Sequence, residues 1–265
     1  VVTINLPRIG YLASDRQDFF TRLNHLMDLA ANSLTTKRKV ISRLLDAGLF
    51  PYSARYLRHL NNHFSTIGLV GMNEMLENFM GVDLVDDEGR AFSVEVLEHM
   101  RDRLADYQEE TGDLFNLEAT PAESTSYRLA KHDRHHYPDI RTSGDAEPFY
   151  TNSSQLPVDF TDDVFEALDM QDDLQTKYTG GTVFHAFLSE AAEDWRAAAK
   201  LVKGIAENYH LPYFTISPTF SVCPIHGYLA GEHYTCPKCE EEQRSELQQK
   251  IMELEAEREQ LGGKR

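Results

Sequence analysis

Residues 62–74 read NHFSTIGLVGMNE, and this stretch carries the strongest indication of the fold class. Its centre, HFSTIGLVG (63–71), is rich in apolar and β-branched residues and ends in glycine, which is typical of a short buried strand followed by a turn. Helical spacing of apolar residues precedes it at 15–47, where Asp15 is the predicted N-cap, and follows it at 72–80 and 93–111. Strands that alternate with helices predict an α/β fold.

Shorter patterns extend this alternation toward both ends of the chain. Residues 1–12 predict a core strand that turns at Pro7 and Gly10, whereas 189–208 predicts a helix. Two more runs, 115–119 and 213–217, are typical of strands.

The bulk properties exclude several classes of protein. The chain has 265 residues, of which 41% are hydrophobic and 26% are charged, as expected for one large globular domain or two small ones. Its net charge of -17 opposes binding to nucleic acid or anionic membranes. No apolar run approaches the roughly 20 residues that span a bilayer, and the first residues lack the basic start of a signal peptide. We therefore expect neither nucleic acid nor membrane as a partner.

All three cysteines lie in one short segment, with the spacing of metal ligands. Cys223-Pro-Ile-His226 and Cys236-Pro-Lys-Cys239 are two ligand pairs separated by nine residues. Three thiolates and one imidazole predict a closed, structural zinc site, and paired knuckles rarely arise by chance from free cysteines. His233 is an alternative fourth ligand in place of His226. Cysteines used in this way indicate a reducing compartment.

The last segment differs from the rest. Residues 240–260 place the few apolar residues Leu247, Ile251 and Leu254 among many charges, which predicts an exposed helix or a short coiled-coil arm. The chain is accordingly expected to comprise three parts: an α/β part at 1–216, a zinc-binding module at 217–240 and a helical tail at 241–265.

Five segments carry a resemblance to one enzyme family: NHFSTIGLVGMNE (62–74), NLEATPAES (116–124), YTNSSQLP (150–157), DLQTKYTGGT (173–182) and SPTFSVCPIHGYLAGEHYTCPKC (217–239). In these segments the chain resembles the C-terminal portion of an anaerobic (class III, glycyl-radical) ribonucleoside-triphosphate reductase. The resemblance implies the later part of a ten-stranded α/β barrel, here a partial catalytic barrel, followed by a zinc knuckle and a helix.

The resemblance also implies radical chemistry that reduces ribonucleotides to deoxyribonucleotides for DNA replication in the cytoplasm. In the family, a radical-SAM activase generates a glycyl radical. That radical generates a cysteine thiyl radical, which abstracts the 3′ hydrogen of the ribose. Ribonucleoside triphosphates, formate and a second copy of the full enzyme are the implied partners. The 265 residues contain no RVxGY-like radical motif, and the family's thiyl cysteine lies upstream of the matching region. We therefore expect this segment alone to be inactive, as a gene fragment, split subunit or extein.

Three of the matching segments imply contacts with the substrate. The residue types in them also have plainer explanations: Thr120, Pro121 and Glu123 match a capping box at a helix start, and the polar run after Tyr150 matches a turn. The residues that the resemblance assigns to substrate binding are Glu118, Thr120, Glu123, Asn152, Ser153, Ser154, Ser217, Thr219 and Ser221.

A hypothesis of another class is a non-catalytic zinc-knuckle interaction protein whose helical arm binds a partner. The charged tail favours it, and the loops that resemble an active site oppose it. Nucleotide binding discriminates between the two.

Overall fold

The computed structural model describes residues 1–144, 147–157, 160–188, 194–218, 220–230, 233 and 235–262. The chain forms two compact units. The first comprises Val1–Phe184 with Asn208–Thr215, and the second comprises His185–Glu207 with Ile216–Arg265. The division into parts at 1–216, 217–240 and 241–265 remains a prediction.

A parallel three-stranded sheet forms the centre of the first unit. Its order is β1 (Val2–Asn5), β2 (Ser65–Val70) and β3 (Phe115–Glu118), with β2 in the middle. Every residue of β2 is buried, including the polar Ser65 and Thr66, so the short buried strand predicted within 63–71 is confirmed. The strand register pairs Val2 with Ile67. The mixed α/β character that the sequence predicts is confirmed.

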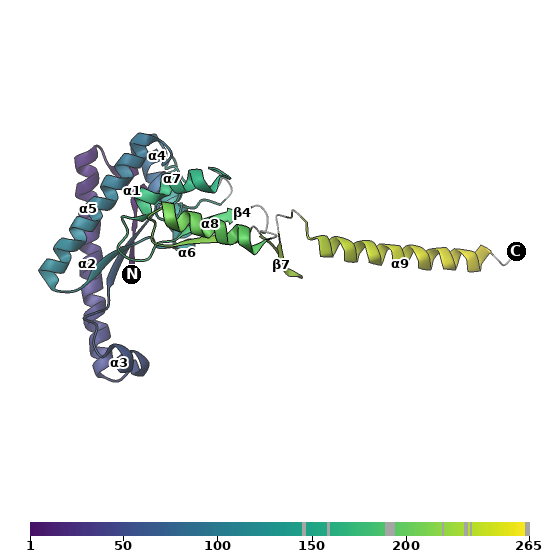
Figure 1. The fold of residues 1–265 in the computed structure, drawn as a ribbon, viewed down its shortest axis with the longest axis horizontal. Coiled ribbons are helices and arrows are strands. Elements are labelled where there is room, and N and C mark those ends of the chain that lie inside the picture. Colours follow the sequence, from purple (N-terminus) through teal and green to yellow (C-terminus); the bar gives the residue numbers. More distant parts are fainter. Residues whose placement is uncertain are drawn as a thin grey trace. The chain divides into compact units, whose positions relative to one another are not determined.

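Helices connect and cover these strands (Figure 1). They are α1 (Leu6–Leu12), α2 (Arg16–Asp46), α3 (Pro51–Leu57), α4 (Met72–Phe79), α5 (Asp87–Thr111), α6 (Glu123–His136) and α7 (Val164–Gln175). Asp15 caps α2 as predicted, because its side chain accepts from the backbone N–H of Asp18 at 2.9 Å. The strand predicted for 1–12 is correct only at its start, because residues after Asn5 form α1 with Pro7 in its first turn.

The core of the first unit lies between the sheet and helices α2, α4 and α5. Phe19 of α2 is its aromatic centre, with ring centroids 5.2 Å from Phe79 and 5.3 Å from Phe92. Polar contacts join α2 to α5 at the edge of this core, including an ion pair of 2.8 Å between Arg103 and Asp28. This packing gives the unit a hydrophobic core of its own.

The structure explains why the segment 63–71 ends in glycine. Gly71 has φ of 75° and precedes α4. A Cβ atom at Gly71 would lie 2.3 Å from Cγ of Pro7 in α1. The close contact of α1 with the end of β2 therefore requires glycine.

The described part of the second unit is built from short strands and two helices. The remaining elements of the chain are β4 (Phe184–Leu188), α8 (Trp195–Asn208), β5 (Phe214–Pro218), β6 (Phe220–Cys223), β7 (Gly227–Ala230) and α9 (Pro237–Gly262). Strands β4 and β5 pair with each other, and β6 and β7 form an antiparallel hairpin.

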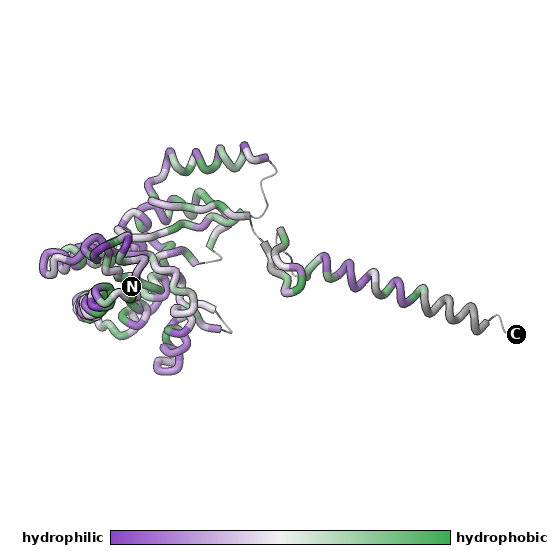
Figure 2. The backbone as a smooth tube through the Cα atoms, turned by 90° about the horizontal axis from the view of Figure 1, so that it is seen from below, coloured by the Kyte–Doolittle hydropathy of each residue, from purple (hydrophilic) through white to green (hydrophobic). Residues whose placement is uncertain are grey.

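Helix α9 is polar along most of its described length (Figure 2). Its apolar residues Leu247, Ile251 and Met252 are exposed by 60%, 47% and 69%. An exposed helix was predicted here. Among the described helices, none combines the length and the apolar character needed to cross a bilayer.

Candidate functional site

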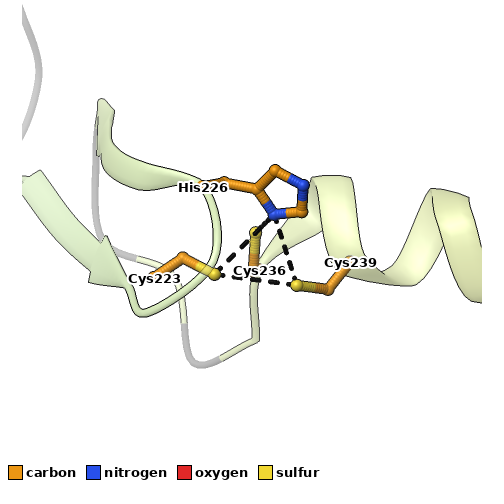
Figure 3. A group of neighbouring side chains, drawn as sticks. All are labelled: Cys223, His226, Cys236 and Cys239. Carbon is orange, nitrogen blue, oxygen red and sulfur yellow. Dashed lines mark hydrogen bonds between the residues drawn. The ribbon is translucent and has the colours of Figure 1, made fainter.

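A cluster of three cysteines and one histidine lies where the β6–β7 hairpin meets the start of α9 (Figure 3). Cys223 ends β6, and His226 occupies the turn before β7. Cys236 directly precedes α9, and Cys239 lies in its first turn. Each short loop therefore presents two ligand atoms to the same point.

The distances within the cluster fit one tetrahedral ion. The Cys223 and Cys239 sulfurs are 3.6 Å apart. Nδ1 of His226 lies 3.7, 3.5 and 3.4 Å from the sulfurs of Cys223, Cys236 and Cys239. Zinc bonds of ~2.3 Å to sulfur and ~2.0 Å to nitrogen place neighbouring ligands about 3.5–3.8 Å apart. The predicted ligands are thus brought together in a geometry that can hold zinc.

The thiols of this cluster influence one another. Backbone N–H groups of His226 and Ile225 lower the pKa of Cys223 to about 6. A hydrogen bond with the Cys223 sulfur is the main reason that the pKa of Cys239 rises to about 12. A divalent cation at the centre would stabilise all three thiolates together, because it supplies the positive charge that they lack.

A carboxylate contacts the ring nitrogen of His226 that does not face the sulfurs. Oε1 of Glu242 in α9 lies 3.0 Å from Nε2 of His226, on the side of the ring opposite to the sulfurs. Glu242, Cys223 and Cys236 raise the pKa of His226 to about 9, so metal binding at neutral pH would displace a proton from Nδ1. His226 belongs to the donor group found among the described residues, and the alternative ligand His233 does not.

A second set of predicted residues lies at the carboxyl edge of the parallel sheet. Thr120 follows β3, and Asn152 bridges to Val70 at the end of β2. The backbone N–H of Met72 donates to the carbonyl of Ser153 at 2.9 Å. The segments NLEATPAES and YTNSSQLP, far apart in sequence, are thereby brought together where ligands bind in α/β sheets.

Internal hydrogen bonds use most of the hydroxyl groups at this edge. Ser153 donates to the carbonyl of Thr120 at 3.1 Å, and Ser154 lies 2.8 Å from the hydroxyl of Tyr178. Thr120, Ser153 and Ser154 are all buried. By contrast, the half-buried side chains of Glu118 and Asn152 have no hydrogen-bond partner in the described part of the chain. Of the predicted residues that the structure describes at this edge, these two keep side-chain polar groups without an internal partner.

The capping box expected at 120–123 is wrong. Helix α6 begins at Glu123, its N-cap position is Ala122, and no side chain caps it. Thr120 is buried at the sheet instead, with Oγ1 3.4 Å from the carbonyl of Leu69. The side chain of Glu123 lies outside the described part of the structure.

The third predicted segment belongs to the second unit. Ser217 lies in β5, and Ser221 lies in β6, where its hydroxyl accepts from the backbone N–H of His233 at 2.7 Å. Thr219 lies outside the described residues.

Sequence reasoning missed a buried carboxylate that organises the sheet edge. Glu74 is fully buried, and its Oε1 accepts from the backbone N–H of Thr151 at 2.9 Å and from the hydroxyls of Thr151 and Ser143 at 2.6 Å each. These bonds hold the segment before Asn152 against α4. A glutamate in the first turn of a helix is common, so the motif GMNE gave no signal of this role.

Comparison with known proteins identifies the family. A model of the anaerobic ribonucleoside-triphosphate reductases matches residues 1–252. The chain therefore belongs to the anaerobic ribonucleoside-triphosphate reductase family. The resemblance inferred from the five segments is confirmed.

Individual relatives agree with this assignment. The chain is 27% identical over 242 residues to the anaerobic ribonucleoside-triphosphate reductase of Enterobacteria phage T4, covering 84% of this chain and 38% of the relative. The reductase of Escherichia coli K12 is 24% identical over 264 residues, covering 90% and 36%. The chain thus spans little more than one third of the length of these relatives.

Solved structures show the same fold. The Thermotoga maritima anaerobic ribonucleotide reductase in complex with dATP and CTP has a TM-score of 0.73 and 30% identity, covering 89% of this chain and 39% of that one. Another anaerobic ribonucleotide reductase has a TM-score of 0.75 and 29% identity, covering 89% and 37%.

Proposed function

We propose that this chain is a portion of an anaerobic reductase that converts ribonucleoside triphosphates to deoxyribonucleotides by glycyl and thiyl radical chemistry. The observation that carries the proposal is the family match over residues 1–252. The product would serve DNA replication in the cytoplasm. The radical-bearing glycine and cysteine belong, in this proposal, to segments outside these residues.

The carboxyl edge of the β1–β3 sheet supplies substrate-pocket loops. Glu118 and Asn152 contribute free polar groups, while Thr120, Ser153 and Ser154 fix the loop backbones through their buried hydrogen bonds. Glu123, Ser217, Thr219 and Ser221 complete the proposed set. In the full enzyme, the sheet continues as part of a ten-stranded barrel, with β1 and β3 adjoining further strands.

The cluster Cys223, His226, Cys236 and Cys239 binds a structural zinc ion. Four protein ligands fill a tetrahedral ion and leave no position for substrate. The distances of 3.4–3.7 Å between the sulfur and nitrogen atoms of the cluster support this role. Zinc would hold the β6–β7 hairpin to the start of α9.

The full enzyme further requires a radical-SAM activase, formate as reductant and a second copy of itself. These partners follow from the family resemblance. They act on the assembled enzyme and not on this chain alone.

Reconstitution tests the proposal. This chain is mixed with the remaining polypeptide of the reductase, and binding of a ribonucleoside triphosphate and formation of deoxyribonucleotide are measured anaerobically with activase and formate. We expect activity only in the complete mixture, and a loss of nucleotide binding for Asn152→Ala relative to the exposed control Asn61→Ala. A mixture that assembles but neither binds nucleotide nor forms product contradicts the proposal. A helical partner captured by α9 without nucleotide binding would favour the interaction protein instead, because Leu247 and Ile251 are exposed.

A further inference from the structure

Helix α9 contributes two groups to the cysteine and histidine cluster on one face. Cys239 supplies a sulfur 3.4 Å from Nδ1 of His226. Glu242, three residues further on, supplies the carboxylate oxygen 3.0 Å from Nε2 of the same ring. Residues three apart lie on the same face of a helix, so α9 holds one ligand and also contacts the ring of another.

An imidazole ligand needs such a partner in a way that a thiolate does not. Neutral histidine carries one N–H and one lone pair, and either nitrogen can hold the proton. Nδ1 faces the three sulfurs, so it is the nitrogen that would present its lone pair to a metal ion held among them. The proton then belongs on Nε2, where the Glu242 oxygen is placed to accept it.

We propose that Glu242 is a positioning residue for the metal site: it accepts the Nε2–H hydrogen bond of His226 and so fixes the ring and its tautomer for coordination through Nδ1. The inference rests on the proposed zinc site and adds a residue outside its ligand set. Such outer partners typically change metal affinity by about 10–100-fold. The Glu242 side chain is 62% exposed and that of His226 16%, so water competes for this bond and the lower end of that range applies.

The test measures zinc affinity of the full chain by competition with a chromogenic chelator. Glu242→Ala is compared with Glu241→Ala, which removes the same charge from an exposed neighbouring position of α9. We expect about 10-fold weaker binding for Glu242→Ala and wild-type affinity for Glu241→Ala. Glu242→Gln should retain most of the affinity, because its amide oxygen can still accept from Nε2. Equal affinities for Glu242→Ala and Glu241→Ala overturn the proposal.

Repeating the measurement in a His226→Cys variant distinguishes an effect on the orientation of the imidazole ring from an effect on helix α9. A thiolate at this position has no Nε2–H, so adding Glu242→Ala to His226→Cys should leave zinc affinity unchanged. The Co²⁺ spectrum of each variant reports the donor set directly. A full additional loss in the cysteine background overturns the proposal. A wild-type chain that takes up no zinc instead contradicts the proposed metal site itself.

Discussion

The first unit and the cysteine and histidine module (residues 217–240) differ in what surrounds their polar groups. In the first unit a large apolar core surrounds them, whereas in the module they converge on one another. In the first unit, Glu74 and Asp133 are fully buried and bonded to backbone and side chains around a large apolar core. Among the residues after 216 whose side chains the structure describes, Cys223 and Leu229 are the buried apolar or sulfur side chains. Two buried side chains stabilise little by themselves. The first unit is thus organised by packing, and the proposed zinc ion would organise the module.

The largest effect is expected for the module. Cys236→Ser removes one of the four proposed ligands, and a structural zinc site contributes apparent folding free energy of ~10 kcal/mol or more. We expect loss of stoichiometric zinc and unchanged thermal unfolding of the first unit, measured by elemental analysis and calorimetry. Lys238→Ala, at an exposed position between two ligands, should keep its zinc. In the reconstituted enzyme, Cys236→Ser should reduce glycyl-radical yield more than nucleotide binding. An unimpaired radical yield would refute this order of effects.

Gly71→Ala tests how much close packing contributes to the stability of the first unit. The new Cβ would meet the ring of Pro7 at 2.3 Å, and φ of 75° is unfavourable for alanine. We expect a loss of about 3–5 kcal/mol in the free energy of unfolding of the first unit, from overpacking and backbone strain together. Gly112→Ala is the matched control, since φ is 72° but nothing lies within 4 Å of its Cβ. It should cost about 1–2 kcal/mol. Equal losses in urea unfolding would show that the contact of Pro7 with Gly71 is unimportant.

Asp133→Ala should produce the next largest loss. The buried carboxylate of Asp133 accepts at 2.8 Å from each of Asn5, Arg8 and Tyr150. Removing one member of a buried ion pair leaves its partners unsatisfied and costs about 3 kcal/mol or more. The 36% exposure of the Arg8 side chain places the effect at the lower end. Asp139→Ala, which removes an exposed carboxylate bonded to Tyr11, serves as control. A loss no larger than the control's would disprove a stabilising role for the buried network.

The smallest expected effect is a pH dependence confined to the first unit. Burial lowers the pKa of His99 below its ordinary value of 6.5, with weaker opposing effects from Asp102 and Asp106. As the pH falls below about 6.5, the unfolded chain takes up a proton before the folded one does, so stability declines until the folded pKa is passed. Replacing His99 by Gln should flatten this decline in urea titrations between pH 7 and pH 5. An unchanged slope would assign the decline to other groups.

Local sequence patterns were sufficient for features that depend on near neighbours. Asp15 caps α2 because its bond partner is three residues away. The CxxH and CxxC pairs come together because each short turn already aims two donors. The burial of Ile67, Leu69 and Val70 in β2 follows from their apolar side chains, which lie close together in the sequence.

Features that depend on distant segments could not be predicted. The hydroxyl of Thr120 does not cap α6, because it donates instead to the carbonyl of Leu69 in β2, 51 residues away in the sequence. Glu74 and Asp133 look like ordinary surface charges until the fold buries them. Glu242 joins His226 only after α9 and the β6–β7 hairpin meet at the ligand cluster.

Hydrogen exchange with and without a zinc chelator tests the contrast between the two regions most directly. The protein as purified should contain one zinc ion per chain. Chelation should abolish protection of the β6–β7 hairpin and the first turns of α9, while β2 and α5 keep theirs. A chain without metal, or a hairpin that stays protected after the metal is removed, would contradict the account.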